Sequence, residues 1–122
     1  GMGAFALLLL DKIEEAQKNN NVVLDGLYSW DEFKILKDKF KDDLTVISIV
    51  VDKNKRYERL EKRNIRALSS KKAEERDIAE IENSAKGGPI AFADYYILNN
   101  GDMDNYLNKL DEITKNIFRS VK

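Results

Sequence analysis

The pattern of apolar and charged positions predicts five helices along the chain. Apolar residues recur at the spacing of one helical face over residues 3–18, 30–40 and 103–120. The stretches 53–63 and 70–83 are highly charged and are predicted as helices with solvated outer faces. Ser29 and Ser70 stand where helix caps are expected, because a serine hydroxyl can accept a hydrogen bond from the first turn. Glu32 follows Ser29 at the spacing of a capping box.

Three short apolar runs lie between the predicted helices, at residues 22–24, 44–51 and 95–98. Each ends in polar residues or glycine, as a buried strand does. Strands that are separated by helices need crossover connections, and these place the strands in parallel. The sequence therefore predicts an α/β protein with three layers, in which helices flank a parallel sheet of about three strands.

The composition limits what this fold can do. The 122 residues are the usual size of one domain, and we expect a single domain over residues 4–120. Lys and Arg number 21 and Asp and Glu number 22, so the balanced charge favours neither a nucleic acid nor a membrane as partner. No apolar run reaches about 18 residues, the length that suggests a membrane span, and we expect a cytoplasmic protein. The absence of Cys and His excludes thiol catalysis, imidazole bases and the ordinary zinc sites.

The carboxyl ends of the predicted strands are the first place to look for a site. Ligands bind at this edge in open α/β sheets, and here the strands lead to Asp25-Gly26, to Asp52 and to residues 99–102. Asp25 can accept a proton from a substrate hydroxyl or contact a metal-bound water. It can equally be a turn residue or a helix cap. Tyr28 and Trp30 follow it, and the pair can stack on a base or anchor the next helix.

Arginines gather in the second half of the chain. Arg56, Arg59 and Arg63 fall on one helical face, and Arg66 and Arg76 follow. Arginine grips phosphate groups with two parallel hydrogen bonds, so this pattern is typical of a phosphate site. Acidic residues lie among them, namely Glu58, Glu61, Glu74 and Glu75. A solvated face with local salt bridges is therefore the alternative interpretation.

Two glycine patterns bear on phosphate binding. The loop Lys86-Gly87-Gly88-Pro89 can bring bare backbone close to a ligand, or it can be a simple connector. None of the six glycines is followed by Lys, so these residues contain no G-x-x-x-x-G-K-[ST] motif. The sequence thus offers no recognisable cradle for a nucleotide's triphosphate.

Taken in order, four segments resemble a P-loop kinase family related to dephospho-CoA kinase. Residues 22–30 are similar to the strand and Asp-Gly turn of nucleotide kinases. Residues 46–63 are similar to the strand and R-x-x-R helix that lead into the kinase lid, and 75–91 to the lid's second helix and exit. Residues 93–101 resemble the Ala-Asp-Tyr strand and adenine loop of dephospho-CoA kinase. The resemblance covers nearly all of residues 4–118.

The resemblance implies phosphoryl transfer from ATP, with Mg²⁺, to a small acceptor such as a CoA-like ligand. By matched position, Asp25 is expected as the catalytic carboxylate on the acceptor side, and no metal site made of protein ligands alone is expected. The lid-like segment spans about residues 56–86. The expected phosphate contacts in and around it are Arg59, Arg63, Arg66 and Arg76. Asn100 and Gly101 are expected to border the adenine, and Tyr28 and Trp30 to line the acceptor pocket.

One departure from this family decides the predicted activity. The first strand and P-loop of that family are expected before Ala4, and the 122 residues of this sequence contain neither. We therefore expect little activity from the chain alone, whether as a fragment or as a lineage that has lost the chemistry. The alternative is a non-catalytic module of the same fold that binds nucleotide or protein. Without that first strand the sheet has a gap or an open edge, and this predicts a homo-oligomer.

Overall fold

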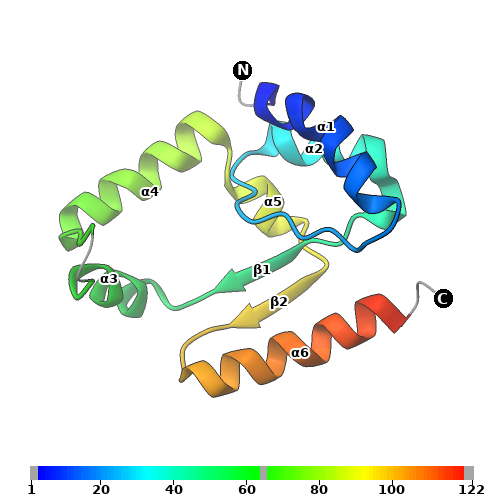
Figure 1. The fold of residues 1–122 in the computed structure, drawn as a ribbon. Coiled ribbons are helices and arrows are strands. Elements are labelled where there is room, and N and C mark those ends of the chain that lie inside the picture. The colour runs from blue at the N-terminus through cyan, green and yellow to red at the C-terminus, as the bar shows by residue number, and fades with distance from the viewer. Residues whose placement is uncertain (1–2, 64–65, 120–122) are drawn as a thin grey trace. The chain divides into compact units, whose positions relative to one another are not determined.

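The computed structural model describes residues 3–63 and 66–119 (Figure 1). The helices are α1 (Ala4–Gln17), α2 (Trp30–Phe40), α3 (Lys53–Glu61), α4 (Ser70–Ser84), α5 (Gly87–Ala91) and α6 (Met103–Arg119), with a 3-10 turn at Lys41–Asp43. The strands are β1 (Ile47–Val50) and β2 (Tyr95–Leu98). The five predicted helices and two of the three predicted strands are confirmed. Among the described residues, no helix is both long enough and apolar enough to cross a membrane.

The chain forms two compact units, one of residues 3–44 and 79–92 and the other of residues 45–63, 66–78 and 93–119. In the first unit the predicted cap of α2 is confirmed, because the Glu32 N–H donates to the Ser29 hydroxyl at 3.1 Å. The Ser29 hydroxyl in turn donates to the Glu32 carboxylate at 2.9 Å. Helix α2 then buries Phe33 and Leu36.

The predicted strand at residues 22–24 is not formed. Residues 21–29 have no regular structure, and the side chain of Val23 is 84% exposed. A strand is stable only when its backbone groups pair with a neighbour. Among the described residues β1 pairs with β2, and residues 22–24 pair with neither. The described sheet therefore has two strands, and the α/β class with a parallel sheet is what the structure confirms.

The sheet lies in the second unit. Strands β1 and β2 run parallel, with Ile47 opposite Tyr95 and Val50 opposite Leu98. The pairing continues beyond both strand ends, because the Asp94 N–H donates to the Val46 carbonyl at 2.8 Å and the Asn99 N–H to the Val50 carbonyl at 2.7 Å. Ile97 is 1% exposed, and α6 packs beside β2 (Figure 1).

Two local expectations need correction. The cap of α4 is Ser69 rather than Ser70, because the Lys72 N–H donates to the Ser69 hydroxyl. The Ser70 hydroxyl instead donates to the Glu61 carboxylate at the end of α3. The expected loop at residues 86–89 is partly the short helix α5. Pro89 fits there because it stands in the first turn, where its missing N–H has no helical partner to lose.

Candidate functional site

The carboxyl edge of the β1–β2 sheet joins two polar segments far apart in the sequence. Strand β1 leads through Asp52 into α3, and β2 leads through residues 99–102 into α6. The backbone N–H of Asp52 donates to the Asn100 side-chain oxygen at 2.9 Å. The Asp102 carboxylate caps α6 by accepting a hydrogen bond from the Asn105 N–H at 2.8 Å. The residues that follow the two strands therefore form one connected polar edge.

Arg59 reaches this edge from α3. One guanidinium nitrogen donates to the Asn99 carbonyl at 2.7 Å, and the other lies 3.4 Å from the Gly101 carbonyl. The sequence predicts a phosphate contact for Arg59, and the structure gives it the backbone of the predicted adenine loop as a partner. Arg59, Asn100 and Gly101 are thus three predicted site residues that the fold brings together.

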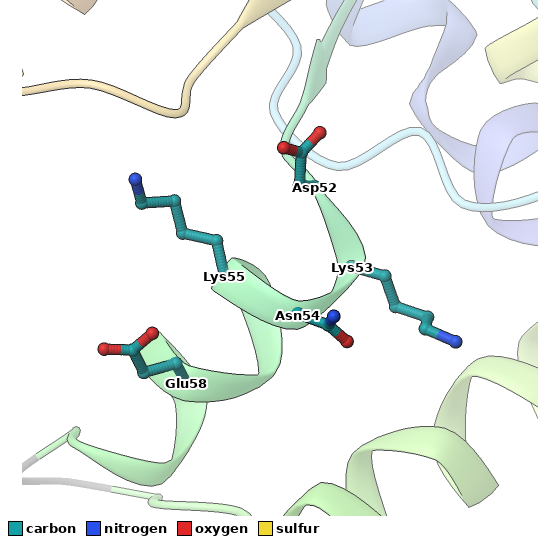
Figure 2. A pocket seen from close by; sticks show the side chains of 5 residues that line it. All are labelled: Asp52, Lys53, Asn54, Lys55 and Glu58. Carbon is teal, nitrogen blue, oxygen red and sulfur yellow. The ribbon is translucent and has the colours of Figure 1, made fainter.

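An open hollow lies beside Asp52 at the start of α3 (Figure 2). Its volume is about 580 Å³, and it is lined by Asp52, Lys53, Asn54, Lys55 and Glu58. Figure 2 shows Lys55 and Glu58 extending to one side of the helix and Lys53 to the other. Lys53, Asn54 and Lys55 are not among the site residues predicted from the sequence. The abrupt change from apolar to polar residues at the end of β1 was the signal that could have found them.

A second hollow of about 540 Å³ shares three of these residues and extends to the start of α4. It is lined by Lys53, Asn54, Tyr57, Glu58, Glu61, Ser70, Lys71 and Glu74. Lys62 donates to the Glu58 carboxylate at 2.8 Å, and this hydrogen bond lowers the pKa of Glu58 and raises the pKa of Lys62. Glu58 therefore stays ionised, and both hollows carry lysines together with carboxylates.

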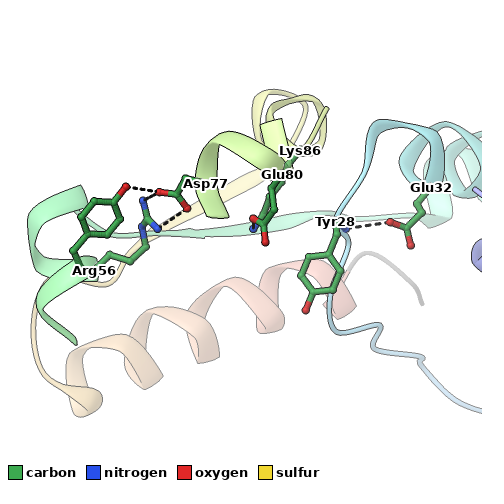
Figure 3. Close-up of polar contacts among 7 residues, drawn as sticks. Tyr28, Glu32, Arg56, Asp77, Glu80 and Lys86 are labelled. Atoms are coloured by element: carbon green, nitrogen blue, oxygen red, sulfur yellow. Dashed lines mark hydrogen bonds and ion pairs between the residues drawn. The ribbon is translucent and has the colours of Figure 1, made fainter. Parts of the chain in front are cut away.

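An ion pair joins α3 to α4 (Figure 3). The two terminal nitrogens of Arg56 donate to the two carboxylate oxygens of Asp77 at 3.0 and 2.6 Å. The Tyr57 hydroxyl donates to the same carboxylate at 2.7 Å. The hydrogen bonds to Asp77 raise the pKa of both Arg56 and Tyr57. Arg56 is thus held by the carboxylate of Asp77, a residue for which the sequence predicted no role.

Of the other predicted lid arginines, Arg63 and Arg66 lie between α3 and α4, and Arg76 lies within α4. Arg63 donates to the Arg66 carbonyl at 2.6 Å. Arg66 has a φ of 57°, in the left-handed region. Both side chains are exposed, and so is that of Arg76 on α4. Their exposure leaves a phosphate role compatible with the structure, and that role remains a prediction.

Asp25 and Tyr28 lie in the first unit, in the irregular segment before α2. The Asp25 side chain is exposed. Gly26 has a φ of 93°, and an added Cβ would meet the Tyr28 ring at 2.8 Å, so this turn requires glycine. The Tyr28 ring is more than half exposed, and the Lys86 ammonium lies 5.6 Å from its centroid. Lys86 also pairs with Glu80 at 2.6 Å.

Trp30 has the contacts of a hydrophobic anchor. Its ring stacks on Phe33 with centroids 5.2 Å apart and lies 5.3 Å from the ring of Phe92. The backbone of Gly88 approaches so closely that an added Cβ would meet the indole at 2.5 Å. These contacts fit the anchoring role considered for Trp30, and its place in an acceptor pocket remains a prediction. The predicted site residues thus divide between the two units.

The carboxylates of the described residues do not form a metal cage. No group of three or more Asp or Glu side chains in this part of the chain could hold a metal ion. Mg²⁺ is often bound through one or two carboxylates together with substrate phosphates. A magnesium ion here would depend on the phosphates of its ligand.

Comparison with known proteins shows which family of α/β proteins this is. A UPF0200 protein of Thermococcus kodakarensis is 30% identical over 125 residues, which cover 99% of this chain and 67% of the relative. UPF0200 proteins of Thermococcus sibiricus and Sulfurisphaera tokodaii are 31% and 33% identical over 121 residues. The chain belongs to the UPF0200 family.

The match does not span the whole length of these relatives. The matched residues make up 96% of this chain in both comparisons. They make up 63% of the Thermococcus sibiricus protein and 64% of the Sulfurisphaera tokodaii protein. No protein-family profile matches the chain. No solved structure matches it either. The family name specifies no reaction.

Proposed function

We propose that this chain is the body of a P-loop kinase-like protein related to dephospho-CoA kinase, and that it binds nucleotide at the carboxyl edge of the β1–β2 sheet. The observation that carries the proposal is the hydrogen bond from the Asp52 N–H to Asn100, which joins the two strand ends at the predicted adenine loop. Ligands of parallel α/β sheets bind at this edge. The resemblance of residues 93–101 to an adenine loop supports the same place.

The chemistry proposed for the whole protein is phosphoryl transfer from ATP to a small acceptor, with Mg²⁺. Asp25 is the proposed acceptor-side carboxylate, and Arg63, Arg66 and Arg76 are the proposed phosphate contacts. Phosphoryl transfer depends on positioning and on neutralising charge, and these residues contain no Walker A motif to do so. We therefore propose nucleotide binding for the chain itself, and transfer only for a protein that also carries a phosphate-binding loop and a third strand. The proposed location of such a protein is the cytoplasm.

Calorimetric titration of the chain with Mg-ATP, ADP and dephospho-CoA tests this proposal. Saturable binding of an adenine nucleotide is expected, and Asn100→Ala is expected to weaken it about tenfold, the equivalent of about 1.4 kcal/mol. Asn108→Ala is the matched control, because Asn108 is an exposed amide on α6. Absence of binding at millimolar ligand, or equal weakening by the two variants, would contradict the proposal.

A second candidate function is a module that binds protein, including a second copy of itself. It is favoured by exposed apolar side chains on one face of β2, where Tyr96 and Leu98 are 51% and 48% exposed. Residues two apart in a strand share a face, so these two side chains form one apolar surface. A homo-oligomer that covers this surface is our proposal for the assembly.

A further inference from the structure

We infer that Arg59 is a positioning residue that holds the loop of residues 99–102 in its ligand-binding conformation, rather than a phosphate contact. The nucleotide part of this inference rests on the proposed function. The ordering of the loop rests on the contacts alone.

The two carbonyls that Arg59 contacts fix the direction of two peptide groups. Arg59 donates to the Asn99 carbonyl at 2.7 Å and lies 3.4 Å from that of Gly101. There are no cis peptide bonds among the described residues, and in a trans peptide the C=O and the following N–H point in opposite directions. The N–H groups of Asn100 and Asp102 therefore point away from the guanidinium. A base edge or another planar polar group could bind on that side.

The same loop is held at both ends by the secondary structure around it. The Asn99 N–H extends the β1–β2 pairing, and the Asp102 carboxylate caps α6. Asn100 accepts a hydrogen bond from the Asp52 N–H. Arg59 adds a contact to this loop from a helix side chain. It lies in α3, at the beginning of the predicted lid-like segment. The conformation of the loop therefore depends on the position of α3.

The contacts of Arg59 lie at the surface, and this shapes what its loss would do. Arg59 and Gly101 are both exposed. Water can therefore solvate the Asn99 and Gly101 carbonyls when the guanidinium is removed. Exposed polar contacts contribute little to global stability. Removing the guanidinium should therefore loosen the loop without unfolding the unit.

Amide hydrogen exchange of three variants tests the loop ordering. Arg59→Met keeps the aliphatic stem and removes the donors, and Arg59→Lys keeps the charge with a single donor group. Lys115→Met is the control, because it removes an exposed cation that pairs within α6. We expect the Asn99 and Asn105 amides to exchange about tenfold faster in Arg59→Met, with an intermediate rate in Arg59→Lys and unchanged rates in the control. Unchanged exchange at these amides in Arg59→Met would overturn the inference.

Titration with ATP and with inorganic tripolyphosphate separates positioning from phosphate contact. If Arg59 positions the loop, Arg59→Met should weaken the binding of ATP about tenfold and leave the binding of tripolyphosphate unchanged. Arg59→Lys should restore part of the ATP affinity. Equal weakening of both ligands would overturn the inference in favour of a phosphate contact. If wild type binds neither ligand while Arg59→Met still speeds exchange, the loop ordering is supported and the proposed function fails.

Discussion

Arg56 binds Asp77 through both terminal nitrogens of its guanidinium, at 3.0 and 2.6 Å. The two residues are 21 positions apart and join α3 to α4. Two parallel hydrogen bonds give such a pair both strength and a fixed direction. The Asp77 carboxylate is half-buried and also accepts a hydrogen bond from the Tyr57 hydroxyl. This contact therefore sets how α3 lies against the middle of α4.

Removing the Asp77 carboxylate should loosen the connection between α3 and α4. We expect Asp77→Asn to lower the free energy of unfolding by about 1–2 kcal/mol, a value reduced for the partial exposure of both partners. Urea denaturation measures the change, and a double-mutant cycle with Arg56→Met isolates the pair. A coupling free energy near zero would contradict this account of the contact.

The Tyr57 hydroxyl gives the protein a predicted sensitivity to high pH. Its hydrogen bond to Asp77 raises the pKa of Tyr57 above the ordinary value of 10.0. The folded state thus favours the protonated phenol, and this stabilisation is fully present below pH 10. It is lost as the pH rises through the raised pKa of the folded state.

Ultraviolet absorbance and thermal unfolding between pH 8 and about 11 test the Tyr57 prediction. The absorbance titration curves of wild type and Tyr57→Phe should differ by the signal of one phenol, and that phenol should titrate above the ordinary pKa of tyrosine. The melting temperature should fall more steeply with pH in wild type than in Tyr57→Phe. Parallel pH profiles for the two proteins would show that the hydroxyl adds no such stabilisation.

Gly88 and Gly87 offer a matched pair of substitutions beside the single tryptophan. An added Cβ on Gly88 would meet the Trp30 ring at 2.5 Å, whereas one on Gly87 would have nothing within 4 Å. We expect Gly88→Ala to destabilise the protein by about 1–3 kcal/mol, because the indole must move. Gly87→Ala should be neutral or stabilise slightly, because alanine favours the helix. Trp30 fluorescence should change in Gly88→Ala alone, and equal spectra for the two variants would contradict the close contact.

The exposed face of β2 predicts self-association. Replacing Tyr96 and Leu98 by Lys should convert a homo-oligomer to a monomer, because two charges on the apolar surface oppose its burial. Sedimentation velocity of wild type and the double variant measures the change. Lys115→Met serves as a surface control on α6. A monomeric wild type at about 100 μM, far above the micromolar range of a stable complex, would contradict the proposed oligomer.

Local sequence signals predicted much of the fold. The start of α2 could be read from Ser29 and Glu32, because the cap is made within four residues. Parallel pairing of the later strands followed from the helices between them. The strand expected at residues 22–24 does not form, because it pairs with no neighbouring strand among the described residues. Such pairing depends on distant parts of the chain, and the local sequence does not show it.

The candidate site was predictable in its location rather than in its contacts. The polar residues after β1 and β2 indicated the carboxyl edge of the sheet. The hydrogen bonds from Arg59 to the Asn99 and Gly101 carbonyls span 40 and 42 positions, and no local pattern encodes them. The same holds for Arg56 and Asp77, whose spacing reveals nothing until α3 and α4 are placed. Helix faces could identify these arginines, and only the fold could identify their partners.

The central claim is that nucleotide binds at the carboxyl edge of the β1–β2 sheet. Titration of the isotopically labelled chain with Mg-ATP, followed by nuclear magnetic resonance, tests it most directly. We predict saturable shift changes centred on the amides of Asn100, Gly101 and Asp102, and their reduction in Asn100→Ala. Unchanged amide signals in residues 99–102 at millimolar Mg-ATP would contradict the claim.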